Sequence, residues 1–141
     1  MRFEGRVFKE GKWLAIEVPV LGVYTQARTK RSAYAMIKDA IEEMADVDGF
    51  EVQIFPGRGE YFEVGSVDQG TLFAFLLRRQ RQVRGLSLAD VAKRLGLKSR
   101  NAYARYEQGK AIPTVEKLAQ LLKAVNPDHE FVLKLESASN P

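Results

Sequence analysis

The 141-residue chain contains no cysteine, which excludes disulfide bridges, thiolate nucleophiles and cysteine-ligated zinc. It has a single histidine, His129, so a multi-histidine metal site is excluded as well. No apolar stretch approaches the roughly 20 residues that cross a bilayer, and the first residues lack the charged-then-apolar pattern of a secretion signal. We therefore expect a cytoplasmic protein that holds no metal or cofactor and contacts no membrane.

Acidic residues become scarce in the second half of the chain. Residues 1–66 carry 9 Lys/Arg and 11 Asp/Glu, a net charge of −2, whereas residues 67–141 carry 13 and 7, a net charge of +6. Between Arg78 and Lys110, ten basic residues face two acidic ones, a local excess of +8. A change of sign indicates two modules, of which the second faces a polyanion. The alternative is a solvated face with spare basic residues.

Short strands around one helix are expected in the first half. Within residues 2–18 a glycine-containing turn at residues 10–12 separates two apolar-rich runs, and residues 14–18 alternate with period two. Residues 23–27 form a third strand, and Thr29 or Ser32 can cap a helix whose apolar residues run from Ala33 to Met44. Residues 50–55 form a fourth strand. The order β-β-β-α-β predicts an α+β domain over residues 1–65, followed by a glycine-rich linker at residues 66–70.

Helical periodicity dominates the second half, which we assign to one domain over residues 71–141. A first helix runs from Leu72 to Val83, and a second begins at Ser87, where Ser-x-x-Asp forms a capping box. Gly96 ends this second helix and Ser99 caps a third after a very short turn, as in helix-turn-helix proteins. The predicted domain is therefore an all-α helix-turn-helix domain, apart from a possible C-terminal strand.

A fourth helix and a possible strand complete the prediction. Thr114 caps the fourth helix, and its apolar stripe is predicted to consist of Val115, Leu118, Ala119, Leu122 and Val125. Residues 130–136 alternate apolar and charged side chains, which favours a C-terminal strand.

The third helix carries the candidate base-reading residues. If Ser99 is its N-cap, Arg100 and Asn101 occupy the first turn, and Arg105 follows Asn101 by four residues on the same face. Arginine can donate two hydrogen bonds to guanine, and asparagine can pair with adenine. Helix-turn-helix proteins place such N-terminal side chains in the major groove. Ala102, Tyr103 and Tyr106 are expected to supply the packed side of this helix.

Candidate contacts to the DNA backbone surround that helix. They are Ser99, Lys98, Arg79 and Lys110. Arg78, Arg81 and Arg84 are further candidates, and six basic contacts would give a log–log salt slope of roughly −5. The alternative for the cluster from Arg78 to Arg84 is a solvated helix face.

Residues 86–122, LSLADVAKRLGLKSRNAYARYEQGKAIPTVEKLAQLL, resemble the Cro/C1-type (XRE) helix-turn-helix family. Its pattern falls on Ala92, Gly96, Ser99, Glu107, Gly109 and Pro113. The resemblance implies operator-DNA binding, with the base-contacting positions on Arg100, Asn101 and Arg105. Tyr103 and Tyr106 stand where the family often has Trp or Ile.

The first half is similar to HicB-type antitoxins over residues 16–44, IEVPVLGVYTQARTKRSAYAMIKDAIEEM. The matching residues are Pro19, Leu21, Gly22, Thr25, Gln26, Thr29, Ala33, Ala40 and Ile41. Leu21 replaces the usual proline, and Ala27 the usual glycine. The resemblance implies a partial RNase H-like sheet without nuclease activity, which binds and neutralises a small mRNA-cleaving HicA-like toxin while the second domain represses the operon.

The sequence leaves two alternatives to an antitoxin. A ligand-responsive repressor would use the first half as a small-molecule sensor. A nuclease would need several carboxylates converging on metal ions, but Glu42 and Glu43 are polar-face helix residues and Glu17 is a lone acid on a strand. We therefore expect no enzymatic activity. Two-fold reading of DNA half-sites implies a homodimer or higher homo-oligomer. The sequence does not identify the toxin-binding residues or the operator.

Overall fold

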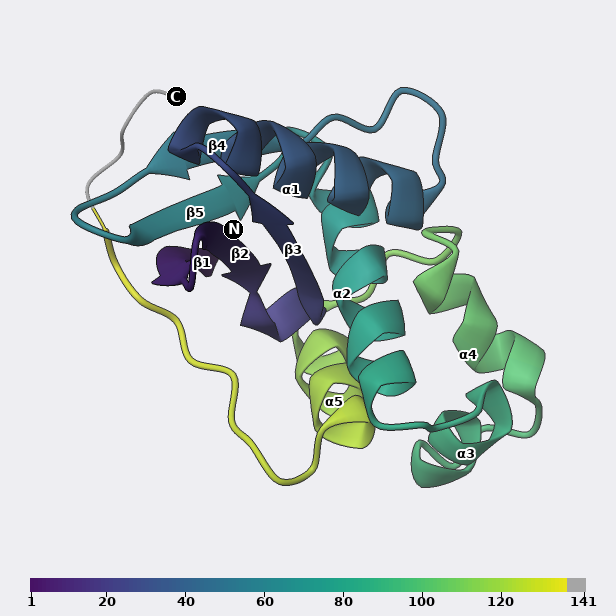
Figure 1. Cartoon of the computed structure of the whole chain (residues 1–141). Helices are drawn as coiled ribbons and strands as arrows, with labels where there is room; N and C mark the ends of the chain where they lie inside the picture. The colour runs from purple at the N-terminus through teal and green to yellow at the C-terminus, as the bar shows by residue number, and fades with distance from the viewer. Residues whose placement is uncertain (137–141) are drawn as a thin grey trace. The chain divides into compact units, whose positions relative to one another are not determined.

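The computed structural model of the chain describes residues 1–136 (Figure 1). The chain divides into two compact units, Met1–Leu72 and a second that begins at Phe73. Residues 137–141 of the predicted second domain lie outside the described residues. Within residues 1–136, no helix is both long and apolar enough to cross a membrane.

The first unit is a five-stranded antiparallel sheet with one long helix. Its elements are β1 (Arg2–Glu10), β2 (Trp13–Val18), the short 3-10 helix η1 (Pro19–Leu21), β3 (Val23–Ala27), α1 (Lys30–Ala45), β4 (Gln53–Pro56) and β5 (Tyr61–Gly65). The strand order is β3-β2-β1-β5-β4, so β1 is central. The predicted α+β class is confirmed.

One strand was missed by the sequence prediction of β-β-β-α-β. Tyr61–Gly65 forms β5, which pairs with both β1 and β4. The glycines around this segment suggest a domain boundary in the sequence. In the structure, Gly59 (φ 61°) instead lies in the turn that joins β4 to β5. The buried Phe62 and Val64 alternate with the more accessible Tyr61 and Glu63, as in a strand with one face in the core. The unit therefore has the order β-β-β-α-β-β.

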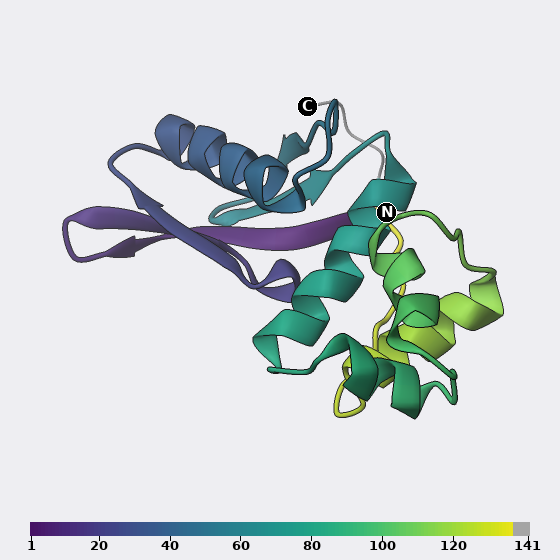
Figure 2. The ribbon, with the colours of Figure 1, turned by 90° about the vertical axis from the view of Figure 1, so that its right-hand side faces the viewer.

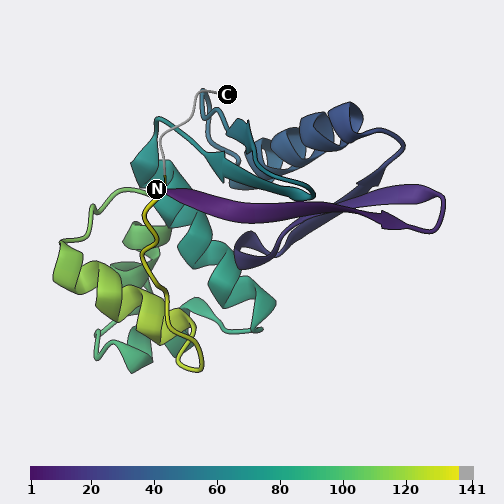
Figure 3. The same cartoon turned by 90° about the vertical axis from the view of Figure 1, so that its left-hand side faces the viewer.

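Helix α1 covers one face of the sheet, as Figures 2 and 3 show from opposite sides. Thr29 caps it: the Thr29 side chain accepts from Ser32 N, and the Ser32 side chain accepts from Thr29 N. Ala33, Ile37 and Ile41 are fully buried. The predicted apolar stripe is therefore correct at these positions, although Met36 is exposed.

The other sheet face is polar and aromatic. On β1, Phe3, Gly5 and Val7 are buried, so strand alternation places Arg2, Glu4 and Arg6 on the opposite side. Arg6 lies 3.0 Å from Glu60 and 3.9 Å from Glu17. Arg2 lies 3.3 Å from Glu63 and stacks over the Phe55 ring at 3.5 Å. This face therefore carries ion pairs and exposed rings, including Tyr24 and Tyr61.

The second unit is helical. Helix α2 (Gln69–Val83) contains the boundary between the units, and α3 (Leu88–Arg94), α4 (Arg100–Glu107) and α5 (Val115–Val125) follow. Helix α2 begins inside the glycine-containing segment that reads as a linker. The predicted helices and their order are confirmed for the described residues.

Two predictions for this unit are wrong. Residues 130–136 form no strand in the described structure, where Val132, Leu133 and Leu135 are 83%, 105% and 99% exposed. The stripe of α5 is also shifted: Leu121, Ala124 and Val125 are buried, whereas Val115 and Ala119 are exposed. Leu118 and Leu122, which the predicted stripe also includes, are only half-buried.

The packing of β1 against β5 predicts intolerance at Gly5. A Cβ at Gly5 would lie 2.2 Å from the Phe62 ring, which is fully buried and in edge contact with Tyr34. We expect Gly5→Ala to lower the free energy of unfolding by about 1–3 kcal/mol, as overpacked cores do. Urea unfolding of the purified chain measures this. Gly70→Ala in α2, where the nearest atom is 3.7 Å away, is the matched control and should not destabilise.

Candidate nucleic-acid interface

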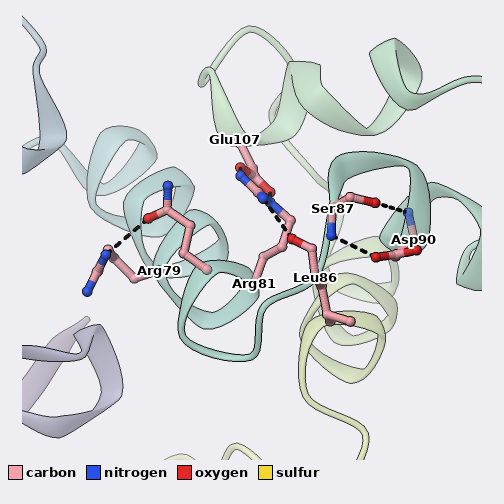
Figure 4. A network of polar contacts seen from close by, with 7 residues as sticks. Arg79, Arg81, Leu86, Ser87, Asp90 and Glu107 are labelled. Carbon is pink, nitrogen blue, oxygen red and sulfur yellow. Dashed lines mark hydrogen bonds and ion pairs between the residues drawn. The ribbon is translucent and has the colours of Figure 1, made fainter.

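Helix α3 begins at a capping box. Ser87 Oγ accepts from Asp90 N at 3.0 Å, and Asp90 Oδ2 accepts from Ser87 N at 2.8 Å (Figure 4). The hydrogen bonds from the backbone and the side chain of Ser87 lower the pKa of the Asp90 carboxyl below its ordinary value. The charged carboxylate therefore stays in place at the positive end of the helix. Val91 and Ala92 are the buried residues of α3.

The turn between α3 and α4 depends on Gly96. Its φ of 70° lies in the left-handed region, which favours glycine. Leu97 N donates to Ala92 O at 2.9 Å, and Gly96 N donates to Lys93 O at 3.0 Å, so the turn satisfies the last carbonyls of α3. Ser99 then caps α4 by accepting from Ala102 N at 3.3 Å. These contacts fix the direction in which α4 leaves α3.

Helix α4 exposes the residues predicted to read bases. Arg100, Asn101 and Arg105 are all exposed, and Asn101 and Arg105 lie one turn apart on the same side. Tyr103 and Ala104 are buried, while Ala102 and Tyr106 are half-buried. The packed side is thus centred on Tyr103 and Ala104 and not on Tyr106, because these two face the neighbouring helices.

The exposed face of α4 extends beyond the predicted residues. Gln108 is exposed and follows Arg105 by three residues, so it continues the line of Asn101 and Arg105. Its amide has the donor and acceptor pair that can meet an adenine edge. The i+3 spacing from Arg105 is the sequence signal that could have identified it.

A buried ion pair holds α4 against α2 (Figure 4). Arg81 Nε donates to Glu107 Oε2 at 2.7 Å, and Arg81 Nη2 donates to Glu107 Oε1 at 2.9 Å. The two side chains are only 13% and 5% exposed. Arg81 Nη1 also donates to Leu86 O at 2.9 Å, between α2 and α3. One guanidinium therefore links the end of α4 to the turn that precedes α3.

Tyr103 lies beside this ion pair. Burial raises the pKa of its phenol well above the ordinary value, and the Glu107 carboxylate raises it further. The phenol therefore stays neutral, which fits a core role for Tyr103.

The ion pair corrects one of the predicted phosphate contacts. Arg81 is occupied by Glu107 and Leu86, so it is not a backbone-contacting residue. Arg84 Nη2 lies 3.4 Å from His129 Nδ1, on the side where Asn126 meets Gln80. Sequence spacing alone could not separate these arginines from the accessible ones.

The remaining backbone candidates differ in accessibility. Lys98, Ser99 and Lys110 are exposed at the two ends of α4. Arg79 is half-buried, and its Nη1 donates to Gln82 Oε1 at 3.1 Å. Desolvation by burial lowers the pKa of Arg79, with Arg78 adding to the effect, but a guanidinium remains charged at neutral pH. Three of the four predicted residues therefore flank the exposed face of α4.

Two further contacts fix the helices behind α4. Arg94 Nη1 donates to Ala124 O at 2.9 Å, which ties α3 to α5. Asn126 Nδ2 donates to Gln80 Oε1 at 3.0 Å, and both side chains are buried. Neither contact was predicted. Within the described part of the chain, no group of three or more His, Asp or Glu side chains could hold a metal ion.

The buried ion pair predicts a large loss of stability on single substitution. Removing either partner leaves a buried charge without compensation, so Arg81→Met or Glu107→Leu should lower the free energy of unfolding by about 3–5 kcal/mol. The double variant Arg81→Met/Glu107→Leu buries no charge and should be more stable than both single variants. Urea titrations followed by circular dichroism give these values. A double variant as unstable as the worse single variant would contradict the assignment.

No curated protein matches the chain. The family model described as a helix-turn-helix domain matches residues 72–130. This match covers α3, the turn, α4 and α5 together with most of α2, and it supports sequence-specific DNA binding by the second unit.

Proposed function

We propose that the protein is a sequence-specific transcriptional repressor that also acts as the antitoxin of a HicAB-like toxin–antitoxin pair. One observation carries the DNA-binding part: Arg100, Asn101 and Arg105 are exposed together on α4, directly after the turn at Gly96. In helix-turn-helix proteins the N-terminal side chains of the second helix meet base edges in the major groove. In this proposal, Arg100 and Arg105 pair with guanines and Asn101 with adenine.

Contacts to phosphate position this helix on the duplex. The exposed Lys98 and Lys110 supply charge at its two ends, and Ser99 and the free amides of the first turn face the same region. Arg79 adds a fourth contact from α2. Arg81 is paired with Glu107 and does not contact phosphate in this proposal. The cluster from Arg78 to Arg84 therefore supplies fewer phosphate contacts than its sequence indicates. The salt slope should therefore be shallower than six contacts would give.

Acidic surface supports the antitoxin role of the first unit. Glu4 and Glu63 lie directly opposite each other in the β1–β5 register, on the sheet face away from the buried Phe3 and Gly5. Like charges directly opposite each other destabilise a pair of strands. Of these two carboxylates, Glu63 forms an ion pair with Arg2 at 3.3 Å. A cation from a basic partner would relieve this repulsion. An RNA-cleaving toxin has such a basic surface, because its substrate is a polyanion.

The packing of the first unit favours a protein-binding surface over a small-molecule sensor. Ile16, Ile37, Ile41 and Phe62 are fully buried between α1 and the sheet. A Cβ at Gly5 finds no space there. In this proposal residues 1–65 are a non-catalytic toxin-binding domain, comparable to the partial RNase H-like sheet of HicB-type antitoxins, and residues 71–141 bind the operator.

Substitutions on α4 test the DNA-binding proposal. With an operator selected from a random duplex library, Arg100→Ala or Arg105→Ala should weaken binding by about 1–3 kcal/mol and relax the preference at the contacted base. Arg79→Ala should weaken binding to all sequences about equally, because phosphate contacts carry no sequence information. Lys9→Ala in β1 is the control and should bind normally. Unchanged affinity for both α4 variants would reject the base-reading assignment.

The antitoxin proposal predicts that a small basic protein is encoded beside this chain, and co-expression of the two tests it. The two should copurify, and the chain should suppress RNA cleavage by its partner. Glu4→Lys should weaken this capture at moderate salt, since it replaces an exposed acid on the sheet face. Glu116→Lys on α5 makes the same charge change elsewhere and is the control. If no such partner copurifies and a metabolite instead changes operator affinity, the ligand-responsive repressor is the better assignment.

A further inference from the structure

One end of the sheet in the first unit gathers four cations beside an aromatic ring. The β1–β2 turn meets the end of β3 there, because Leu14 pairs with Ala27, and Figures 2 and 3 show the two segments at the same end of the sheet. Trp13 is the first residue of β2 and is half-buried. The basic residues at this place are all exposed, and they are Lys12, Arg28, Lys30 and Arg31. These four residues are the basic end of the unit.

Charge is segregated within the first unit. Residues 12–13 and 28–31 carry four basic and no acidic residues, a net charge of +4, whereas the rest of residues 1–66 carries five basic and eleven acidic residues, a net charge of −6. A positive end on an otherwise acidic unit attracts a polyanion.

The cations of the basic end are not neutralised by the acids of the chain. Three of the five cations elsewhere in residues 1–66 form ion pairs, at 3.3 Å, 3.0 Å and 2.7 Å: Arg2 with Glu63, Arg6 with Glu60 and Lys38 with Glu42. Among the ion pairs of residues 1–136, none includes a residue of the basic end. Glu10, the acid in the adjoining strand end, accepts from the Tyr24 hydroxyl at 2.9 Å. The basic end therefore keeps its charge for a ligand.

A hollow of about 350 Å³ lies at this end, lined by Lys12, Trp13 and Arg28. The Arg28 guanidinium lies over the Trp13 ring, 5.2 Å from its centroid. The volume is near the lower end of the range for ligand sites, roughly 300–1,000 Å³, so the hollow admits one base. Lys30 Nζ donates to Gly59 O at 3.2 Å, which leaves Lys12 and Arg28 as the cations of the hollow itself. An aromatic face and two cations are thus combined in one site.

We propose that this hollow binds single-stranded nucleic acid, with a base stacked on Trp13 and the flanking phosphates held by the basic end. Proteins that bind single strands combine a basic groove with aromatic rings on which bases stack, and arginine adds cation–π contacts. The inference goes beyond the proposed function, because it concerns a surface of the first unit and requires neither an operator nor a toxin.

Two other anionic partners fit this surface less well. A duplex keeps its bases stacked inside, so it would use the cations but not Trp13. A membrane surface is bound by exposed apolar side chains together with cations. At residues 12–13 and 28–31, however, Trp13 is the only large apolar side chain, and it is half-buried. A single strand uses every group at this end of the sheet.

Intrinsic fluorescence of the full chain tests the stacking, because Trp13 is the only tryptophan. A single-stranded octamer of uridylate should quench the Trp13 emission to saturation. The affinity should fall with salt with a log–log slope of roughly −3, as four phosphate contacts to a single strand would give. Inorganic polyphosphate has the charge but no base and should not quench, and vesicles containing phosphatidylserine should not change the emission.

Three results of this titration overturn the proposal. They are the absence of saturable quenching by the octamer, equal quenching by polyphosphate, and a blue shift of the Trp13 emission on vesicles without quenching by the octamer. The readout is a residue of the first unit, so a failure here and a failure of operator binding by α4 give different results.

A pair of double variants separates the hollow from general charge. Lys12→Ala/Arg28→Ala keeps Trp13 but removes both cations of the hollow, so it should weaken the quenching titration roughly tenfold and halve its salt slope. Lys9→Ala/Arg58→Ala removes two other exposed cations of the same unit and is the matched control, with a much smaller loss expected at physiological salt. All four side chains are exposed, so both variants should keep the circular dichroism of the parent chain. An equal loss in the two variants overturns the assignment of the hollow.

Discussion

The position of α4 depends on the ion pair between Arg81 and Glu107. The planar guanidinium of Arg81 donates a hydrogen bond to each of the two carboxylate oxygens of Glu107, a geometry that suits arginine. Both side chains are buried in the helical unit. A third hydrogen bond, from Arg81 to Leu86 O, also connects Arg81 to the segment that precedes α3. The exposed arginines of α4 are thus displayed by a helix whose C-terminal end is fixed by a buried arginine. Charge serves two purposes in this unit, and burial decides which arginine has which role.

Local features of the fold could be predicted from the sequence. Caps depend on a few consecutive residues, and Thr29, Ser87, Ser99 and Thr114 all cap the helices expected of them. Gly96 in the α3–α4 turn could also be predicted, because the turn needs a positive φ angle that favours glycine. The exposed side of α4 followed from helical spacing once its N-cap was known. These features need no information about distant parts of the chain.

Three of the errors involve contacts between distant residues. Strand β5 is short, and it is placed in the sheet by its pairing with β1, some 60 residues earlier. The role of Arg81 depends on Glu107, 26 residues away. The stripe on α5 was misplaced because Val115 and Ala119 satisfy helical spacing as well as Leu121 and Val125 do. Periodicity shows that a helix has an apolar face, but the neighbouring elements determine which apolar residues are covered.

The capping hydroxyl of Ser99 has a consequence for how this helix can change during evolution. Its oxygen accepts from Ala102 N, and its hydrogen remains able to donate to an anion. An aspartate there would keep the helix start intact but repel a phosphate, and an alanine would lose both interactions. Among common residues, threonine and asparagine share both properties. If Ser99 contacts phosphate as proposed, few substitutions preserve both the helix start and nucleic-acid affinity, which leaves this position little freedom to drift.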